Sequence, residues 1–381
     1  MQNIYLDNAA TTALEPEVLE CMIDAYQQVF GNPSSNHQFG RKAKTILEGS
    51  RKQIARLLNC EAFEIYFTSG GTESANLILH NAVHNLKVKR IISSKIEHQA
   101  VLLTLNTLRS QYGTEICFVH HLPDGNIDID HLEVLLHEPS DTLVSLMMVN
   151  NEIGNILAME QVADLCKKYQ AFFYSDCVQS VGHMPVDLRK IQADFITASA
   201  HKFHGPKGIG FAFVKKGIPI GPMITGGEQE RGVRAGTENI VSILGMEKAL
   251  TLATTNMEKD NKHLQELKDY FIVQLKKTWP EITFNGNSGF FELSAPHLLS
   301  VRFPEMVPML LFKLDLKGIA ASAGSACQSG SEKGSHVLKE ILHEEEQKTT
   351  TVRFSFSKYN TLYEIDLVME ALKEILRKDK G

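Results

Sequence analysis

The sequence predicts an α/β protein whose main sheet is mostly parallel. Over about the first 255 residues, short apolar runs rich in β-branched residues alternate with amphipathic stretches. Continuous apolar strands that are separated by helices are typical of a parallel sheet covered on both faces. The chain has 381 residues, which exceeds the roughly 250–300 residues that one core usually serves. We therefore expect two domains.

The elements of the first domain follow one another in a regular order. The expected strands are residues 64–68, 90–94, 142–149, 171–175, 194–199 and 209–214, and the expected helices are residues 41–58, 72–86, 98–111 and 160–169. Each strand is short and β-branched or aromatic, and each helix has apolar residues at helical spacing. Residues 221–236 contain several glycines and are expected to form a long functional loop.

The pattern changes after about residue 255, where a long charged helix is expected over residues 257–279. Strands at 298–303 and 351–356 then alternate with helices at 306–314 and 362–377. This arrangement predicts a smaller α+β domain. We place the large domain at residues 15–255 and the small domain at residues 1–14 and 256–381.

The composition excludes several classes of protein. The hydrophobic content is 43%, the charged content is 22% and the net charge is −6, so no basic excess attracts nucleic acid or anionic lipid. No apolar run reaches the roughly 18–20 residues of a membrane helix, and the N-terminus lacks the features of a signal peptide. The six cysteines contain no C-x-x-C pair, which argues against a disulfide framework or structural zinc. We expect a cytoplasmic protein.

A possible anion site follows the first of these strands. Residues 68–74 (TSGGTES) place two glycines before a helix that begins near Thr72. Backbone N–H groups at such a helix start suit a phosphate group. A capped turn without a ligand would have the same sequence. The chain contains neither G-x-G-x-x-G nor G-x-x-x-x-G-K-[ST], so dinucleotide and nucleoside-triphosphate binding lack their usual motifs.

Two further strands are followed by ionisable residues. Asp176 ends an apolar strand, where its carboxylate needs a cation or hydrogen-bond donors. A protonated pyridine nitrogen would serve, although helix caps and metal ligands occur at similar places. Lys202 follows the strand at 194–199, and burial there would lower its pKa and make the amine nucleophilic. An exposed lysine at a strand end is the alternative. His201 and His204 have no suitably spaced ligand partners, so we expect no metal.

The remaining polar groups are His98, Asn151 and Cys327. His98 follows Glu97 at the start of a helix, and Asn151 follows a strand. Parallel sheets bind ligands at the carboxyl ends of their strands, where His98 and Asn151 would meet the groups at 68–74, 175–179 and 199–202. Cys327 lies among small residues in the segment 323–331 (AGSACQSGS), which favours an accessible thiol; an inert small residue is the alternative.

The sequence resembles the NifS/IscS-like cysteine desulfurases, which are class-V aminotransferase-family enzymes of pyridoxal-phosphate fold type I. The resemblance runs from YLDNAATT at residues 5–12, through FGNPSS at 30–35, to VRFS at 352–355, and covers essentially the whole chain. It implies a seven-stranded, mostly parallel sheet in a large domain that binds the cofactor pyridoxal 5'-phosphate. It also implies that a loop at about residues 322–336 of the small domain carries the catalytic cysteine.

Matching positions then suggest roles around the cofactor ring. Lys202 would bind the cofactor covalently, Asp176 would pair with its pyridine nitrogen, and Gln179 would contact its ring hydroxyl oxygen. His98 would stack on the ring and act as an acid–base group. Asn151 would lie near the ring hydroxyl and the substrate.

Other matching positions suggest how the phosphate and the substrate are bound. The phosphate would be held by Gly71, Thr72, Ser199 and His201. Thr237 would reach the phosphate of the neighbouring subunit, which implies a homodimer with shared sites. Arg353 would bind the substrate carboxylate, for which its planar fork is suited.

The implied activity is removal of sulfur from L-cysteine to give L-alanine and a persulfide on Cys327. The persulfide would pass to an acceptor protein for iron–sulfur cluster assembly or tRNA thiolation. Residues 331–338 lengthen the cysteine loop as in the NifS/IscS-like class, although Glu332-Lys333-Gly334 replaces the usual Leu-Glu-Pro. The sequence ends at Gly381, soon after the last expected helix, whereas many members carry a longer tail used for scaffold docking, so the resemblance leaves open whether a scaffold docks in that way.

Three alternatives remain at this stage. A selenocysteine lyase or an aminotransferase would use the same cofactor, and an aminotransferase would not need Cys327. A catalytically silent binding protein of sulfur metabolism would need none of the ionisable residues. Cys177, next to Asp176, is expected to be a packing residue.

Overall fold

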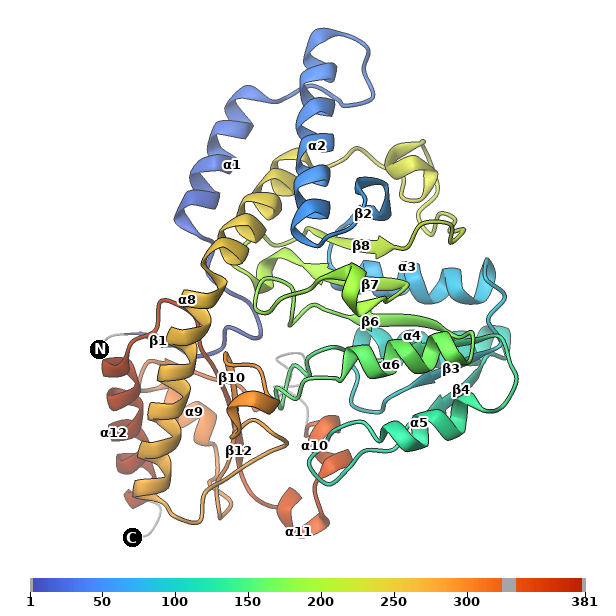
Figure 1. Ribbon diagram of the computed structural model, residues 1–381. Helices are drawn as coiled ribbons and strands as arrows, with labels where there is room; N and C mark the ends of the chain where they lie inside the picture. Colours follow the sequence, from blue (N-terminus) through green and yellow to red (C-terminus); the bar gives the residue numbers. More distant parts are fainter. Residues whose placement is uncertain (1–2, 324–333, 379–381) are drawn as a thin grey trace.

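A seven-stranded sheet organises the larger part of the molecule (Figure 1). The structure is a computed structural model that describes residues 3–323 and 334–378. In spatial order the strands are β2 (Ile65–Thr68), β8 (Gly210–Val214), β7 (Phe195–Ser199), β6 (Phe172–Asp176), β5 (Thr142–Ser145), β3 (Arg90–Ser93) and β4 (Glu115–Phe118). Strand β8 is antiparallel to β2 and β7, and all other neighbours are parallel. The predicted mostly parallel sheet is confirmed.

Helices cover both faces of this sheet because successive strand residues point to opposite sides. Ile91 and Leu143 pack in one cluster with α3 and α4, whereas their neighbours Ile92 and Val144 pack in another with α2, α5, α6 and part of α8. The helices of this part are α1 (Pro16–Gln28), α2 (Gln38–Leu57), α3 (Gly71–His84), α4 (Gln99–Tyr112), α5 (Ile129–Leu136), α6 (Met159–Lys168), α7 (Leu188–Ile191) and α8 (Ile240–Thr278). Short 3-10 turns occupy Ala62–Glu64, Ala200–Lys202, Gln229–Gly232 and Phe291–Leu293.

A second core brings the two ends of the chain together. Its sheets are β12-β10-β9 and β1-β11, with Ile4 paired to Ile319. The strands are β1 (Ile4–Tyr5), β9 (Thr283–Phe284), β10 (Leu298–Arg302), β11 (Ile319–Ala320) and β12 (Thr351–Ser355), and the helices are α9 (Leu310–Asp315), α10 (His336–Ile341), α11 (Glu344–Gln347) and α12 (Leu362–Lys378). The N-terminal residues therefore fold with the C-terminal part.

Helix α8 connects the two cores without a break (Figure 1). Its 39 residues contribute Met246 and Leu250 to the first core and Leu264 and Leu267 to the second. We expected a helix only from residue 257, and this was wrong: the side chain of Asn239 accepts a hydrogen bond from the Ser242 N–H and caps a start at residue 240. The first half is apolar on several sides and buried, so it lacked the charged pattern that marked the second half.

Other boundaries also differ from the sequence-based expectation. The expected helix at 306–314 begins only at Leu310, because Met309 adopts a left-handed conformation with φ 56° just after Pro308. The expected strand at 142–149 ends at Ser145. Helices α1 and α5 and strand β4 were not anticipated. In the loop at 221–236, Ile224 bridges Arg234 and the turn Gln229–Gly232 intervenes.

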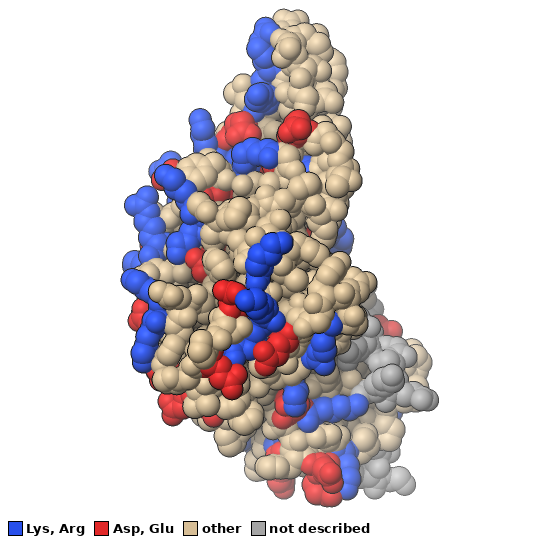
Figure 2. Space-filling model, turned by 90° about the vertical axis from the view of Figure 1, so that its right-hand side faces the viewer, with Lys and Arg blue, Asp and Glu red and all other residues tan. Residues whose placement is uncertain are grey.

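On the face shown in Figure 2, lysine and arginine side chains are interspersed with aspartate and glutamate side chains. Over the ranges 3–323 and 334–378, no helix combines the length and apolar character required to cross a bilayer.

Candidate active site

A cavity of about 250 Å³ opens at the carboxyl ends of the parallel strands. Residues from β6, β7, the starts of α3 and α4, β12 and the N-terminal segment line it. Ten of the predicted site residues contribute to its wall: Gly71, Thr72, His98, Asn151, Asp176, Gln179, Ser199, His201, Lys202 and Arg353. The structure thus brings together side chains that are up to 282 positions apart, from Gly71 to Arg353.

Lys202 extends into this cavity from the short turn after β7. Its Nζ donates to the carbonyl oxygens of Ala9 at 2.6 Å and Ala10 at 3.0 Å. Its own carbonyl accepts a hydrogen bond from His183 Nε2 at 2.8 Å. The lysine is therefore held at both its backbone and its amine, rather than projecting into solvent.

Asp176 lies at the end of β6 and is buried. Its Oδ1 accepts the Val178 N–H at 2.9 Å. Burial raises the pKa of this carboxyl, while nearby His98 and Lys202 act in the opposite direction. A positively charged ring nitrogen beside the carboxylate would favour its ionised form. The aspartate therefore suits the pyridine nitrogen of pyridoxal phosphate.

His98 caps the start of α4 and also faces the cavity. Its Nδ1 accepts the Ala100 N–H at 3.1 Å, so the neutral ring carries its proton on Nε2. Burial lowers the pKa of His98; Asp176 opposes this shift and Lys202 adds to it. The imidazole is therefore neutral and has a defined tautomer.

The phosphate end of the site is built from the start of α3. Gly70 has φ 152°, and a Cβ on Gly71 would lie 2.7 Å from Val178 Cγ2. A second cavity of about 340 Å³ shares Gly71, Thr72, Ser199 and His201 with the first and is also lined by Lys207. His201 Nδ1 lies 3.2 Å from Thr11 Oγ1. A helix N-terminus, hydroxyl groups and a lysine form a donor set that suits a phosphate.

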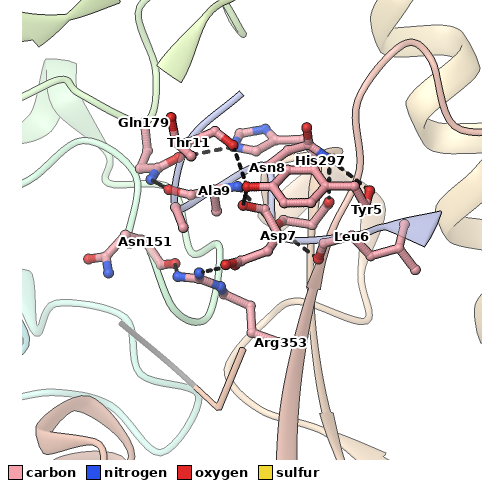
Figure 3. A network of polar contacts seen from close by, with 12 residues as sticks. Tyr5, Leu6, Asp7, Asn8, Ala9, Thr11, Asn151, Gln179, His297 and Arg353 are labelled. Atoms are coloured by element: carbon pink, nitrogen blue, oxygen red, sulfur yellow. Dashed lines mark hydrogen bonds and ion pairs between the residues drawn. The ribbon is translucent and has the colours of Figure 1, made fainter. Parts of the chain in front are cut away.

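Arg353 approaches the cavity from β12 (Figure 3). Its side chain is 2% exposed, and the guanidinium donates from Nη2 to Asp7 Oδ1 at 2.8 Å and from Nη1 to the Asn151 carbonyl at 2.7 Å. Its Nε is buried and has no hydrogen-bond partner among residues 3–323 and 334–378. Gln179 donates from Nε2 to the Ala9 carbonyl at 2.9 Å.

Two predicted site residues are not part of this wall. Thr237 is exposed and does not line either cavity; three residues earlier, Arg234 pairs with Glu73 at 2.9 Å. Cys327 lies outside the described residues. Ser322, before that segment, exchanges backbone hydrogen bonds with Arg353. His336, after it, bonds through Nε2 to the Glu97 carbonyl at 2.9 Å.

The five described cysteines are unsuited to nucleophilic chemistry. Burial is the main cause that raises the pKa of each thiol, to about 12 for Cys60 and Cys177 and to about 11 for Cys117, with upward shifts also for Cys21 and Cys166. Since the thiolate is the reactive form, these raised pKa values disfavour nucleophilic attack by the five thiols. Cys177 is fully buried, as expected of a packing residue.

Some residues of the site were not found from the sequence. Asp7 belongs to the motif YLDNAATT, but no role was predicted for it. The carbonyls of Ala9 and Ala10 are backbone groups, so the residue type does not mark them. Lys207 lies in a glycine-rich turn that resembles any loop.

In the described ranges, no group of three or more histidine, cysteine, aspartate or glutamate side chains is arranged to hold a metal ion.

Comparisons with known proteins identify the family of this chain. The profile of the family "Aminotransferase class-V" matches residues 4–368. A relative named cysteine desulfurase IscS, from Dictyoglomus turgidum, is 40% identical over 99% of this chain and 95% of its own. A solved structure titled NifS-like protein superimposes with a TM-score of 0.90 at 36% identity, covering 99% of this chain and 100% of the other.

A solved structure titled "SspA in complex with cysteine" gives a TM-score of 0.79 at 30% identity, over 94% of this chain and 100% of the other. Both the profile and the relatives extend across nearly the whole chain. The predicted fold and the resemblance are therefore confirmed. The chain belongs to the class-V aminotransferase family, in its NifS/IscS-like cysteine desulfurase branch, whose members depend on pyridoxal 5'-phosphate.

Proposed function

We propose that this protein is a cysteine desulfurase that removes sulfur from L-cysteine and releases L-alanine. One observation carries the proposal: an amine, a buried carboxylate and a guanidinium, from Lys202, Asp176 and Arg353, surround the same cavity. This combination serves a pyridoxal cofactor and a substrate that has a carboxylate.

The residues present fit the cofactor. Lys202 would bind its aldehyde carbon and Asp176 its ring nitrogen, while Gln179 would contact the ring hydroxyl oxygen and His98 its face. The phosphate would be held by Gly71, Thr72, Ser199 and His201. When bound, the cofactor withdraws electrons from the substrate Cα.

The side chains of this protein would then carry out binding and proton transfer. Arg353 would orient the carboxylate of cysteine beside Asn151. Lys202 Nζ would move the Cα proton, with His98 Nε2 as a second acid–base group. The substrate C–S bond breaks with its electron pair left on carbon, which takes a proton and becomes the methyl group of alanine. The Cys327 thiolate forms the new S–S bond, so Cys327 thiol and cysteine yield persulfide and alanine without an external oxidant.

Cys327 is proposed as the sulfur acceptor on two grounds. The segments on either side of residues 324–333 are both bonded beside the cavity, through Ser322 to Arg353 and through His336 to Glu97. Among the described cysteines, Cys166 and Cys177 are buried, the other three are partly buried, and burial raises the pKa of all five thiols.

Mass spectrometry of the holoenzyme after brief treatment with L-cysteine tests this function. A reducible adduct of about 32 Da, one sulfur atom, is expected on the Cys327 peptide. C327A should lose both the adduct and alanine release, whereas C21A, at a partly buried cysteine of α1, should keep both. Unmodified Cys327, or full alanine release by C327A, would refute the mechanism. Formation of a keto acid in place of alanine would indicate an aminotransferase.

We also propose a homodimer with shared sites. Exposed apolar side chains gather along α1 and the start of α2, at 45–75% exposure: Leu19, Ile23, Tyr26, Phe30 and Phe39. Contiguous exposed apolar surface of this kind favours a protein partner. Thr237, exposed and outside its own cavity, is available to a second subunit.

Subunit mixing tests this arrangement. K202A and T237A homodimers are both expected to be impaired. In a mixed dimer, the site of the T237A chain keeps its own Lys202 and receives Thr237 from the partner, so about half of the activity per dimer should return. If Thr237 acts within its own chain, mixing restores nothing.

The persulfide would pass to an acceptor protein of iron–sulfur cluster assembly or tRNA thiolation. A cytoplasmic location fits the scattered, unpaired cysteines at the described positions. Incubation of the persulfurated enzyme with a purified scaffold protein or tRNA-thiolation enzyme, followed by mass analysis of the recipient, distinguishes the two acceptors.

A further inference from the structure

Behind the cavity, two histidine rings stack across the junction of the two cores. The ring centroids of His183 and His297 are 4.1 Å apart with an interplanar angle of 19°. His183 lies in the turn after β6, and His297 immediately precedes β10. His297 is 1% exposed and is not part of the cavity wall. Each ring contacts a different predicted cofactor residue.

The contact of His297 is with Gln179. His297 Nε2 lies 3.4 Å from Gln179 Oε1, and Gln179 Nε2 donates to the Ala9 carbonyl at 2.9 Å. A carbonyl only accepts, so the amide must turn its NH₂ group toward Ala9 and its oxygen toward His297. The oxygen in turn requires a proton on His297 Nε2. Figure 3 shows Gln179 and His297 in this network with Ala9.

The neutral ring of His297 can donate one hydrogen bond, and its surroundings favour Nε2 as the donor. Burial lowers its pKa well below the ordinary value, and His183, Lys268, Arg353 and Lys202 act in the same direction, so the ring is neutral. Its Nδ1 is buried without a hydrogen-bond partner in the described ranges. If the proton were on Nδ1, that N–H would be a buried donor without a partner. The bare Nε2 would then face Gln179 Oε1, so two acceptors would lie opposite each other.

We propose that His297 is a positioning residue that fixes the amide of Gln179 so that its second N–H points into the cavity. The inference rests on the proposed function, because that N–H is offered to the ring hydroxyl oxygen of the bound cofactor. His183 supports the arrangement by stacking on His297 while it holds the Lys202 carbonyl at 2.8 Å. The pair thus links the ring-contacting amide and the cofactor-binding lysine.

A spectroscopic titration of the holoenzyme tests the role of His297. A donor to the ring oxygen stabilises negative charge there, so its loss makes the neighbouring titrating group more basic. Q179A should shift the pH midpoint of the bound cofactor's absorbance upward by about one unit. H297F keeps an aromatic ring against His183 but removes the donor, and should shift the midpoint in the same direction.

Controls separate positioning from general damage. H121F makes the same change at a buried histidine that contacts Ser94 and should leave the midpoint unchanged. H297F should add nothing in a Q179A background, because the two residues act as one unit. If H297F does not fold, H297A should show the shift and H297Q, which has an amide donor, should reverse it.

The outcomes distinguish failure of the role proposed for His297 from failure of the proposed function. A normal midpoint in H297F together with a shifted midpoint in Q179A would overturn the role of His297 and leave the proposed function intact. Absence of any cofactor absorbance in the wild-type protein would overturn the proposed function itself.

Discussion

Asp7 and Arg353 form an ion pair at the edge of the cavity, with Oδ1 and Nη2 separated by 2.8 Å. The carbonyl of Asn151 occupies the other terminal nitrogen. Both ends of the guanidinium are therefore held by the protein, and its orientation relative to the cavity is set before substrate arrives. Preorganisation of this kind lowers the cost of binding.

Replacing Asp7 should therefore weaken cysteine binding more than turnover. In D7N the charge that holds Arg353 is lost while the shape is kept, and we expect KM for cysteine to rise roughly tenfold, about 1.4 kcal/mol of binding energy, with little change in kcat. Steady-state alanine formation measures both constants. D141N, in a largely exposed pair with Lys89, is the control. An unchanged KM in D7N would show that Arg353 is oriented without it.

The start of α3 should not tolerate a larger residue. In G71A the new Cβ would meet Val178 Cγ2 at 2.7 Å and displace the backbone N–H groups at the phosphate end. We expect cofactor affinity to fall by at least roughly tenfold, about 1.4 kcal/mol. G49A, where a Cβ has nothing within 4 Å inside α2, should leave affinity unchanged and stabilise the protein by about 0.5–1 kcal/mol. Equilibrium titration with the cofactor compares them.

The buried ion pair between Arg51 and Glu230 should be important for stability. Both side chains are 2% exposed and two nitrogen–oxygen distances are 2.7 and 2.8 Å. E230Q leaves the buried Arg51 guanidinium with only the half-exposed Glu48 carboxylate, at 3.3 Å, and loss of its buried partner should cost about 3–5 kcal/mol. E138Q breaks a pair in which Arg90 is equally buried but the carboxylate is 76% exposed, and should cost about 0–1 kcal/mol. Urea unfolding midpoints would be compared, and equal losses would contradict the expectation.

Lys268 should make stability depend on pH. Its Nζ is buried and donates to Ser294 Oγ and the Ala295 carbonyl, and burial lowers its pKa to about 7. The unfolded chain keeps a lysine pKa near the ordinary value of about 10.4, so between pH 7 and 10 it binds a proton that the folded chain lacks. The free energy of unfolding should rise with pH in this window by up to about 1.4 kcal/mol per unit.

K268M removes this titration and keeps the length of the side chain. The difference in unfolding free energy between wild type and K268M should therefore change across pH 7–10, with wild type gaining as pH rises. Other titrating groups cancel in the difference. A constant difference would mean that Lys268 titrates at its ordinary pKa.

The sequence was sufficient for the fold class because that depends on local patterns, whereas several residues of the cavity wall, such as Gln179 and Arg353, were predicted only through the family resemblance. Lys202 and Asp176 follow apolar strands, and parallel strands bring their carboxyl ends to one edge. The start of α8 was missed because a helix buried on several sides lacks amphipathic periodicity. Asp7 and His297 were missed as functional residues because their importance arises from contacts with Arg353 and Gln179 far along the chain.

The pairing of Asp7 with Arg353 also has a consequence for synthesis of the protein. These residues are 346 positions apart, and β1 cannot pair with β11 until residue 320 has emerged. A growing chain on the ribosome can build much of the seven-stranded sheet and expose Lys202, but it lacks the arginine and the anchored N-terminal carbonyls. Under the proposed function, a cavity able to bind both cofactor and substrate would therefore form only when translation is nearly finished.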